Sequence, residues 1–186
     1  MRSYPHSQNR NSPTQIKVLF IFLNNVVSKC FTVTTINPTG SKCNEGKCVP
    51  FCGQPWEKNG DHCYLWNPSL QKNWKDAEEF CQSAGGHLVS VNNENKDYIM
   101  DATKRKSLDK VWLGGNDIER EASWRWTDCT PWEFNFWGQG QPDNGKFGDE
   151  DCLAFHHNEF PYRWHDNDCF KEKSFVCSRK ICSGTS

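Results

Sequence analysis

The sequence predicts an α+β fold that is held together by disulfide bonds. A short aromatic strand is followed by two amphipathic helices and then by several more short strands, which is an element order typical of this class. Eleven cysteines in 186 residues are far more than a protein of a reducing compartment usually carries, and they do not form CxxC pairs with zinc-finger spacing. The cysteines therefore indicate a secreted, oxidised protein.

The composition argues against several functions. A formal net charge of −1 leaves no basic field for a phosphate backbone, so we expect no nucleic-acid partner. Nine tryptophans, twelve phenylalanines and four tyrosines can fill a compact core. The HExxH, GxSxG and phosphate-loop motifs are absent, so we expect a binding protein and not an enzyme. A small hydrolase that uses acidic residues is the alternative.

The N-terminal region has the pattern of an export signal. The apolar run 18–27 follows several basic residues and is too short to cross a bilayer as a helix, whereas it suits a secretory signal peptide. A segment that anchors the chain is the alternative. We predict a signal peptide at 1–30, with cleavage after Cys30, no membrane span and an extracellular location.

The remaining chain divides into three parts. Residues 31–51 are polar and rich in turn residues, and we expect them to form a cysteine-containing arm or linker. The folded domain is expected over residues 52–182, and residues 183–186 form a short tail. No asparagine has an acceptable N-glycosylation context.

Helical periodicity marks two segments of the domain. Apolar residues recur at helical spacing from Trp74 to Ala84, and Gly85 and Gly86 end the pattern as a C-cap would. A second amphipathic helix is expected from Asn92 or Asn93 to about Lys104. Its inner face is predicted to carry Tyr98, Ile99 and Ala102.

Short aromatic segments predict the strands. The expected strands are residues 62–66, 111–114, 123–127, 152–156, 162–165 and 174–178. Four tryptophans of this region are expected in the core, namely Trp112, Trp124, Trp126 and Trp164. A long stretch rich in Gly, Pro, Asn and Asp separates Cys129 from Cys152, and a loop of that length inside a compact domain is usually functional or disordered.

An ordered set of motifs carries a family resemblance. The motifs are WLGG at 112–115, WRWTD at 124–128, QPD at 141–143, EDC at 150–152 and WHD at 164–166. Together with the spacing of the cysteines, this set resembles the C-type lectin domain over residues 52–182. Within that family it resembles the long-form, secreted, single-domain lectins of animals.

The resemblance implies three disulfide bonds. These are Cys52–Cys63, Cys81–Cys177 and Cys152–Cys169. Closing the longest of the three loops restricts the unfolded chain by about 4–5 kcal/mol in the entropy model. Four cysteines are left over: Cys43, Cys48, Cys129 and Cys182. A Cys43–Cys48 bond with a Cys129–Cys182 bond is one pairing, and a disulfide-linked or non-covalent homo-oligomer stays open because sequence does not fix connectivity.

The resemblance also implies a calcium site. Gln141, Asp143, Glu150 and Asp166 offer only oxygen atoms, which Ca²⁺ prefers, and they match the primary calcium site of the family. Pro142 is expected to follow a cis peptide bond. In this family two neighbouring sugar hydroxyls complete the coordination of the ion, so sugar binding depends on calcium. A solvated acidic loop with Asx-turns is the alternative.

The resemblance also implies a second cation position. The residues that match the auxiliary calcium site of the family are Asp117, Glu121, Asn144, Glu150 and Asp151. Glu150 would then serve both ions. Surface charges that follow a strand are the alternative.

The order Gln-Pro-Asp carries information about the sugar. In this family it implies galactose or N-acetylgalactosamine, and Phe147 is the nearest aromatic residue that could pack against the apolar face of such a sugar. The expected partners are galactose-type glycans on glycoproteins or microbial surfaces, in innate recognition or agglutination.

His165 departs from the family pattern, in which Trp-Asn-Asp replaces Trp-His-Asp. The position contacts both calcium and sugar in the family, but imidazole supplies no oxygen and suits zinc better than calcium. We therefore expect weaker calcium binding. A zinc cluster of His165 with His156 and His157 is not expected, because adjacent strand residues point to opposite faces. The rival function is a lectin-like domain that has lost sugar binding and binds a protein or another surface, such as ice.

Overall fold

The computed structural model describes residues 34–36, 42–44, 51–145, 148–156 and 162–181. The predicted signal peptide, most of the predicted arm and the short tail lie outside these residues, as do Phe147, His157, Cys30, Cys48 and Cys182. None of the helices among the described residues is long and apolar enough to cross a membrane.

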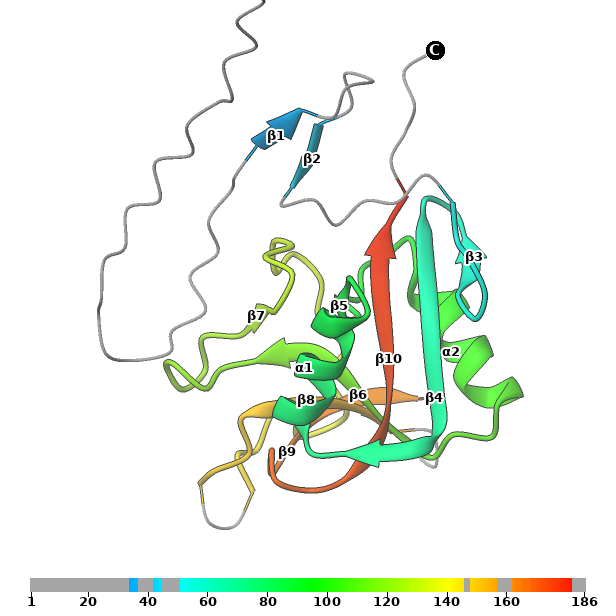
Figure 1. Cartoon of the computed structure of the whole chain (residues 1–186). Helices are drawn as coiled ribbons and strands as arrows, with labels where there is room; N and C mark the ends of the chain where they lie inside the picture. The colour runs from blue at the N-terminus through cyan, green and yellow to red at the C-terminus, as the bar shows by residue number, and fades with distance from the viewer. Residues whose placement is uncertain (1–33, 37–41, 45–50, 146–147, 157–161, 182–186) are drawn as a thin grey trace, which may run out of the picture.

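One mixed sheet forms the centre of the molecule (Figure 1). Its strand order is β3-β4-β10-β6-β8-β9, while β5 pairs with β10 and β7 with β6. These strands are β3 (Glu57–Asn59), β4 (His62–Lys72), β5 (His87–Leu88), β6 (Lys110–Asn116), β7 (Arg125–Trp126), β8 (Cys152–His156), β9 (Arg163–Asn167) and β10 (Lys173–Lys180). The β6–β10 pair is parallel, and the other pairs of this sheet are antiparallel. A separate antiparallel pair is formed by β1 (Thr34–Ile36) and β2 (Lys42–Asn44).

The two helices pack on opposite faces of β10. Helix α1 (Trp74–Ser83) shares a core cluster with Phe175, whereas α2 (Lys96–Arg105) shares another with Val176. Successive residues of a strand point to opposite faces, so these neighbours on β10 assign one helix to each face. The order of helices and strands confirms the predicted α+β class.

Helix α1 matches its prediction because its caps are encoded locally. The Asn73 side chain accepts a hydrogen bond from the backbone N–H of Asp76 at 2.9 Å, which is an N-cap. Gly85 has a φ of +82°, a conformation that favours glycine after a helix.

Helix α2 begins later than predicted. It starts at Lys96, because the preceding residues form a turn through asparagine side chains. The Asn92 Oδ1 atom accepts the backbone N–H groups of Glu94 and Asn95, and Asn95 Oδ1 accepts the N–H of Asn92. Asparagine favours such local bonds over the helix. Ile99 and Ala102 are buried and Tyr98 is partly buried, as predicted.

Strand lengths follow pairing more than sequence pattern. Strand β4 continues to Lys72, six residues beyond its prediction, because its pairing with β10 continues at Asn67 and, past an irregularity, again at Lys72. Strand β9 is shifted to Arg163–Asn167 by its register with β8, and β7 is only two residues long. Strand β8 has the predicted bounds.

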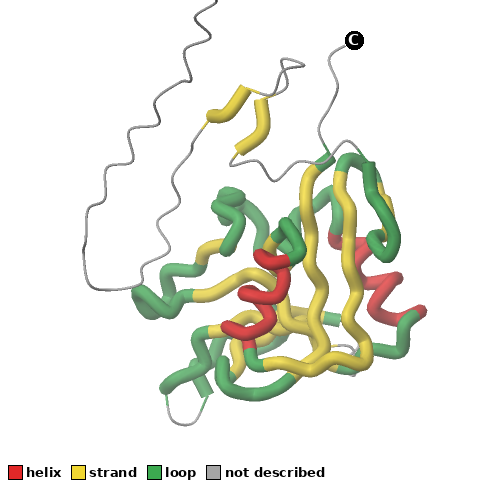
Figure 2. The backbone as a smooth tube through the Cα atoms, viewed as in Figure 1, coloured by secondary structure: helices red, strands yellow, loops and turns green. Residues whose placement is uncertain are grey.

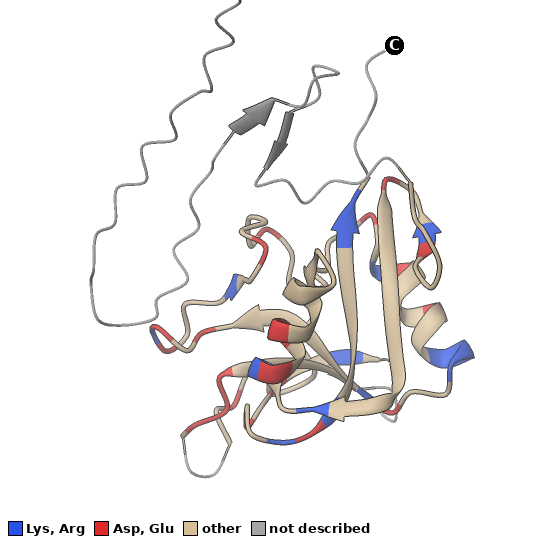
Figure 3. Cartoon of the chain, viewed as in Figure 1, with Lys and Arg blue, Asp and Glu red and all other residues tan. Residues whose placement is uncertain are grey.

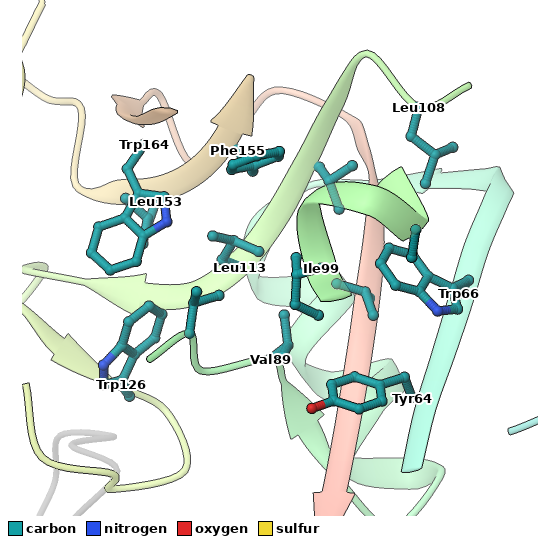
Figure 4. Packing of buried hydrophobic residues seen from close by; sticks show 14 residues of the cluster. Tyr64, Trp66, Val89, Ile99, Leu108, Leu113, Trp126, Leu153, Phe155 and Trp164 are labelled. Carbon is teal, nitrogen blue, oxygen red and sulfur yellow. The ribbon is translucent and has the colours of Figure 1, made fainter. Parts of the chain in front are cut away.

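Buried tryptophans fill much of the core. Trp112, Trp126 and Trp164 are buried, as predicted, whereas Trp124 is only partly buried. Figure 4 shows Trp126 and Trp164 beside Leu153, on the side of the core away from Trp66 and Tyr64.

Disulfide bonds connect the elements. The structure contains Cys52–Cys63, Cys81–Cys177 and Cys152–Cys169, the three pairs that the resemblance implied. The Cys81–Cys177 bond joins α1 to β10, and Cys152–Cys169 joins the start of β8 to the segment after β9. Cys129 is also disulfide-bonded, and none of the cysteines that the structure describes from residue 51 onward is free.

Candidate functional site

Three carboxylates converge where the long loop meets β8 and β9. One oxygen atom each of Asp143, Glu150 and Asp166 lies within 4.8 Å of the other two. Asp143 is exposed, Glu150 is half-buried and Asp166 is buried. Figure 2 shows how little regular structure the chain has between β7 and β8, and Figure 3 shows acidic residues on the loop that leads into β8. We call these three residues the acidic cluster.

Hydrogen bonds to the acidic side chains and to Asn144 hold the loop at the cluster. The Asn144 backbone N–H donates to Asp166 Oδ2 at 2.5 Å, and the Gly145 N–H donates to Asp143 Oδ1 at 3.1 Å. The Asn144 Oδ1 atom accepts the backbone N–H of Glu150 at 2.9 Å. The preceding Gln141–Pro142 peptide bond is cis, as expected. The loop is therefore folded around the acidic side chains.

The cluster concentrates negative charge. Burial raises the pKa of Glu150, and the charges of Asp166 and Asp143 raise it further, while Lys173 opposes them. Carboxylates at this separation repel one another when all are ionised. A bound cation would relieve this repulsion.

Unpartnered oxygen atoms match the needs of a hard cation. Gln141 Oε1 and Asp166 Oδ1 are buried and have no hydrogen-bond partner among the described residues. Buried polar atoms are normally satisfied, and together with the other carboxylates these atoms form an oxygen-only set of the kind that suits Ca²⁺. The residues present therefore fit a calcium ion.

The residues of the auxiliary set also lie close together. Asp117 is buried, its Oδ2 accepts the backbone N–H of Ala122 at 2.8 Å, and its backbone N–H donates to the Asp151 carbonyl at 3.1 Å. Burial raises the pKa of Asp117 to about 6, and the charges of Glu121 and Asp151 add to this shift.

Asn144 links this auxiliary set to the acidic cluster. Its Nδ2 donates to Glu121 Oε2 at 2.5 Å, while its backbone N–H binds Asp166. The structure thus brings Asp143, Glu150 and Asp166 together, and Asn144 connects them to Glu121 of the auxiliary set.

His165 lies face to face with His156. The ring centroids are 4.1 Å apart and the planes differ by 4°, because the register of β8 and β9 places the two residues diagonally across the pair. Burial lowers the pKa of His156 to about 3, and the neighbouring His165 contributes. Parallel rings do not direct two nitrogen lone pairs at one point, so this pair does not form a zinc site.

An aromatic cluster that was not predicted from the sequence lies in the loop that precedes the acidic cluster. Four residues of the loop pack on Trp164, namely Trp132, Phe134, Phe136 and Trp137. The Trp164 backbone N–H also donates to the Phe136 carbonyl at 2.9 Å. The alternation in WEFNFW at 132–137 is the signal that could have predicted this packing.

Comparison with known proteins identifies the family. A family model described as the lectin C-type domain matches residues 70–179. The chain belongs to the C-type lectin domain family. This C-type lectin domain is 32% identical over 136 residues to "Lectin" from Pleurodeles waltl, a match that covers 70% of the chain and 77% of that protein.

Other relatives of this C-type lectin domain are longer proteins. It is 31% identical over 139 residues to "CD209 antigen-like protein D" from Mus musculus, and the match covers 73% of the chain but only 55% of the mouse protein. The chain therefore spans about half the length of that relative.

Solved structures with this fold differ in their described roles. The C-type lectin CEL-I from Cucumaria echinata is 28% identical with a TM-score of 0.65, and the match covers 70% of this chain and 98% of that one. The herring type II antifreeze protein is also 28% identical, with a TM-score of 0.63 and coverage of 70% and 99%. The fold of this C-type lectin domain is thus compatible with more than one kind of ligand.

Proposed function

We propose that this C-type lectin domain binds carbohydrate through a calcium ion held by Gln141, Asp143, Glu150 and Asp166. The convergence of three carboxylates within 4.8 Å, next to two unpartnered oxygen atoms, is the observation that carries the proposal. Lectins are prominent among the relatives of the chain, which supports the same function.

The roles of the residues follow from their chemistry. Asp143, Glu150 and Asp166 would supply negative oxygen atoms to the ion, and Gln141 a neutral one. The ion would offer coordination positions to two neighbouring hydroxyl groups of a sugar. The same side chains accept or donate hydrogen bonds to those hydroxyls, since each carboxylate accepts and the amide of Gln141 does both. Asp166 also holds the loop through Asn144.

We further propose a preference for galactose or N-acetylgalactosamine. The Gln-Pro-Asp order at 141–143 supports it through the family pattern, and Phe147 is the aromatic residue proposed to pack on the sugar. Asp117, Glu121, Asn144 and Asp151 are proposed as ligands of an auxiliary calcium ion, with Glu150 shared. The hydrogen bond from Asn144 to Glu121 supports this grouping.

The wider biology is part of the same proposal. The chain would be a secreted, non-enzymatic protein with a signal peptide at 1–30, an arm at 31–51, the lectin domain at 52–182 and a tail at 183–186. Glycans on glycoproteins or microbial surfaces would be its partners, in innate recognition or agglutination. A disulfide-linked or non-covalent homo-oligomer would increase its avidity.

The rival function is a lectin-like domain without sugar binding. His165 favours it, because an imidazole replaces one oxygen ligand of the family pattern. Similarity to an antifreeze protein supports a domain that binds a protein or a surface such as ice.

The first test is retention of the refolded, disulfide-bonded chain on immobilised galactose with millimolar Ca²⁺, followed by EDTA. Retention that EDTA releases supports the proposal, and weaker retention on immobilised mannose supports the galactose preference. No retention on either sugar, with calcium binding intact by calorimetry, would favour the rival function.

A further inference from the structure

The ring of His165 is enclosed from two sides. One face of the imidazole lies parallel to the ring of His156, with 4.1 Å between the two centroids. The Nε2 edge lies against the backbone of Gly138, where an added β-carbon would come within 2.8 Å of that nitrogen. A ring with neighbours at these distances has little room to move, because protein interiors are close-packed. His165 therefore fills the space between β8 and the long loop.

His156 is held firmly on its side of this stack. It is only 9% exposed and lies in β8, which pairs with β9, the strand of His165 (Figure 1). The Asn167 side-chain amide lies 3.3 Å from His156 Nε2 and donates to the His165 carbonyl at 3.1 Å. One amide group thus contacts both histidines, so the two residues are held together by more than the stacking of their rings.

Gly138 begins the turn that carries Gln141. Its backbone N–H donates to the Trp164 carbonyl at 2.9 Å, and its carbonyl accepts the Gln141 N–H at 3.1 Å. The first bond fixes the turn to β9. The second closes the turn immediately before the cis peptide bond that precedes Pro142. The position of Gly138 therefore determines where Gln141 lies.

The His165 ring thus connects β8 to a proposed calcium ligand. The contacts run from His156 to the His165 ring, from that ring to Gly138, and from Gly138 to Gln141. Asparagine, which the family pattern has at this position, is shorter and has no ring that could stack on His156. The imidazole therefore has a use that does not require it to bind the ion.

We propose that His156 and Gly138 are positioning residues of the sugar site, which hold the His165 ring as a support for the turn that carries Gln141. The inference deepens the proposed function and, for the ion and the sugar, rests on it. Gln141 is the amide of the Gln-Pro-Asp order on which the proposed galactose preference depends. The support should therefore affect the choice of sugar as well as calcium affinity.

Gly138→Ala tests the contact between the turn and the ring. The new methyl group would lie 2.8 Å from His165 Nε2, which is too close, so either the ring or the turn has to move. Because His156 holds the ring, we expect the turn to move and calcium affinity, measured by calorimetry, to fall about tenfold. The preference for immobilised galactose over mannose should fall with it. The matched control is Gly53→Ala, whose β-carbon would meet its nearest neighbour at an ordinary 3.9 Å and should change neither quantity.

The same substitution in a His156→Ala background distinguishes positioning from a local clash. Without its stacking partner the His165 ring can turn away from the new methyl group, so Gly138→Ala should then weaken calcium binding by only about twofold. Equal losses of calcium affinity in the two backgrounds would overturn the inference. If His156→Ala does not fold, His165→Ala provides the background, because it removes the ring itself. Asparagine is not used at position 165, since its oxygen would add a ligand to the ion.

Hydrogen exchange in EDTA separates this inference from the proposed function. The Gln141 amide reports on the turn, because it donates to the Gly138 carbonyl, and its exchange requires neither calcium nor sugar. We expect this amide to exchange about tenfold faster in Gly138→Ala than in the wild type, with no further acceleration when Gly138→Ala is added to His156→Ala. That result supports the inference even if the wild type binds no calcium and no sugar, which would refute only the proposed function. Calcium-dependent galactose binding that Gly138→Ala leaves unchanged, with unchanged exchange at Gln141, overturns the inference and leaves the proposed function standing.

Discussion

The carboxylate of Asp166 accepts a 2.5 Å hydrogen bond from the backbone N–H of Asn144, which lies 22 residues earlier in the chain. One oxygen of Asp166 thus fastens the long loop to β9, while the other is buried and has no hydrogen-bond partner among the described residues. The position of the loop and the binding of a cation therefore depend on the same side chain.

Asp143→Ala is expected to abolish calcium-dependent sugar binding and to leave the fold intact. Asp143 is exposed, and within the described chain its one recorded hydrogen bond joins it to the nearby Gly145, so its removal should cost less than about 1 kcal/mol of stability. Calorimetry should show that calcium affinity is at least about tenfold weaker, because the ion loses one carboxylate ligand. Asp149→Ala, an exposed carboxylate of the same loop, is the matched control. Unfolding of Asp143→Ala would count against the assignment of the site.

His165→Asn is expected to tighten calcium binding by roughly threefold to tenfold, because asparagine restores an oxygen ligand. The stacking of His165 on His156 would be lost, so a small decrease in melting temperature is also expected. Calcium affinity is measured by titration of wild type and His165→Asn. The control is His62→Asn, at the start of β4, which should leave the affinity unchanged. Identical calcium affinities in wild type and His165→Asn would mean that the position contributes no ligand.

Glu78→Ala is expected to destabilise the fold by about 2–4 kcal/mol. Glu78 is buried in α1, accepts the backbone N–H of Leu88 at 2.8 Å and lies 2.5 Å from His87 Nδ1. Removing it leaves a buried N–H without an acceptor. Urea unfolding measures the change, and Glu79→Ala, its exposed neighbour, should change stability by less than about 0.5 kcal/mol. Equal effects of the two variants would contradict the buried role.

The stability of the wild type is expected to rise at alkaline pH relative to Lys173→Met. Burial, and then the charge of Lys110, lowers the pKa of Lys173 from 10.5 to about 8. Between these values the unfolded chain binds more protons than the folded chain, so the free energy of unfolding increases with pH. The difference between wild type and variant should grow by up to about 3 kcal/mol from pH 8 to 10.5. Urea unfolding at several pH values measures this difference. If the free energies of unfolding of wild type and variant changed in parallel with pH, the pKa of Lys173 would not be lowered in the folded chain.

Local sequence signals predicted the elements that local physics governs. Asn73 and Gly85 bound α1 through a side-chain cap and a positive φ, and both act within a few residues of the helix. The predicted start of α2 was wrong because Asn92 can begin either a helix or a turn. Here its side chain accepts a hydrogen bond from the Asn95 backbone N–H and forms a turn. The predicted length of β4 was too short because the strand is extended by pairing with β10 as far as Lys72, across an irregularity in the register.

The sequence by itself determined the family, the oxygen-rich residues of the loop and the three disulfide pairs that the family resemblance implied. These depend on residue types and their order, which a family pattern records. Only the tertiary structure decided that Glu78 is buried beside Leu88, that His165 stacks on His156 and that Lys173 lies on Trp112 near Lys110. Each of these contacts joins residues from different elements, and strand register and packing, which no local pattern encodes, set the distances between them.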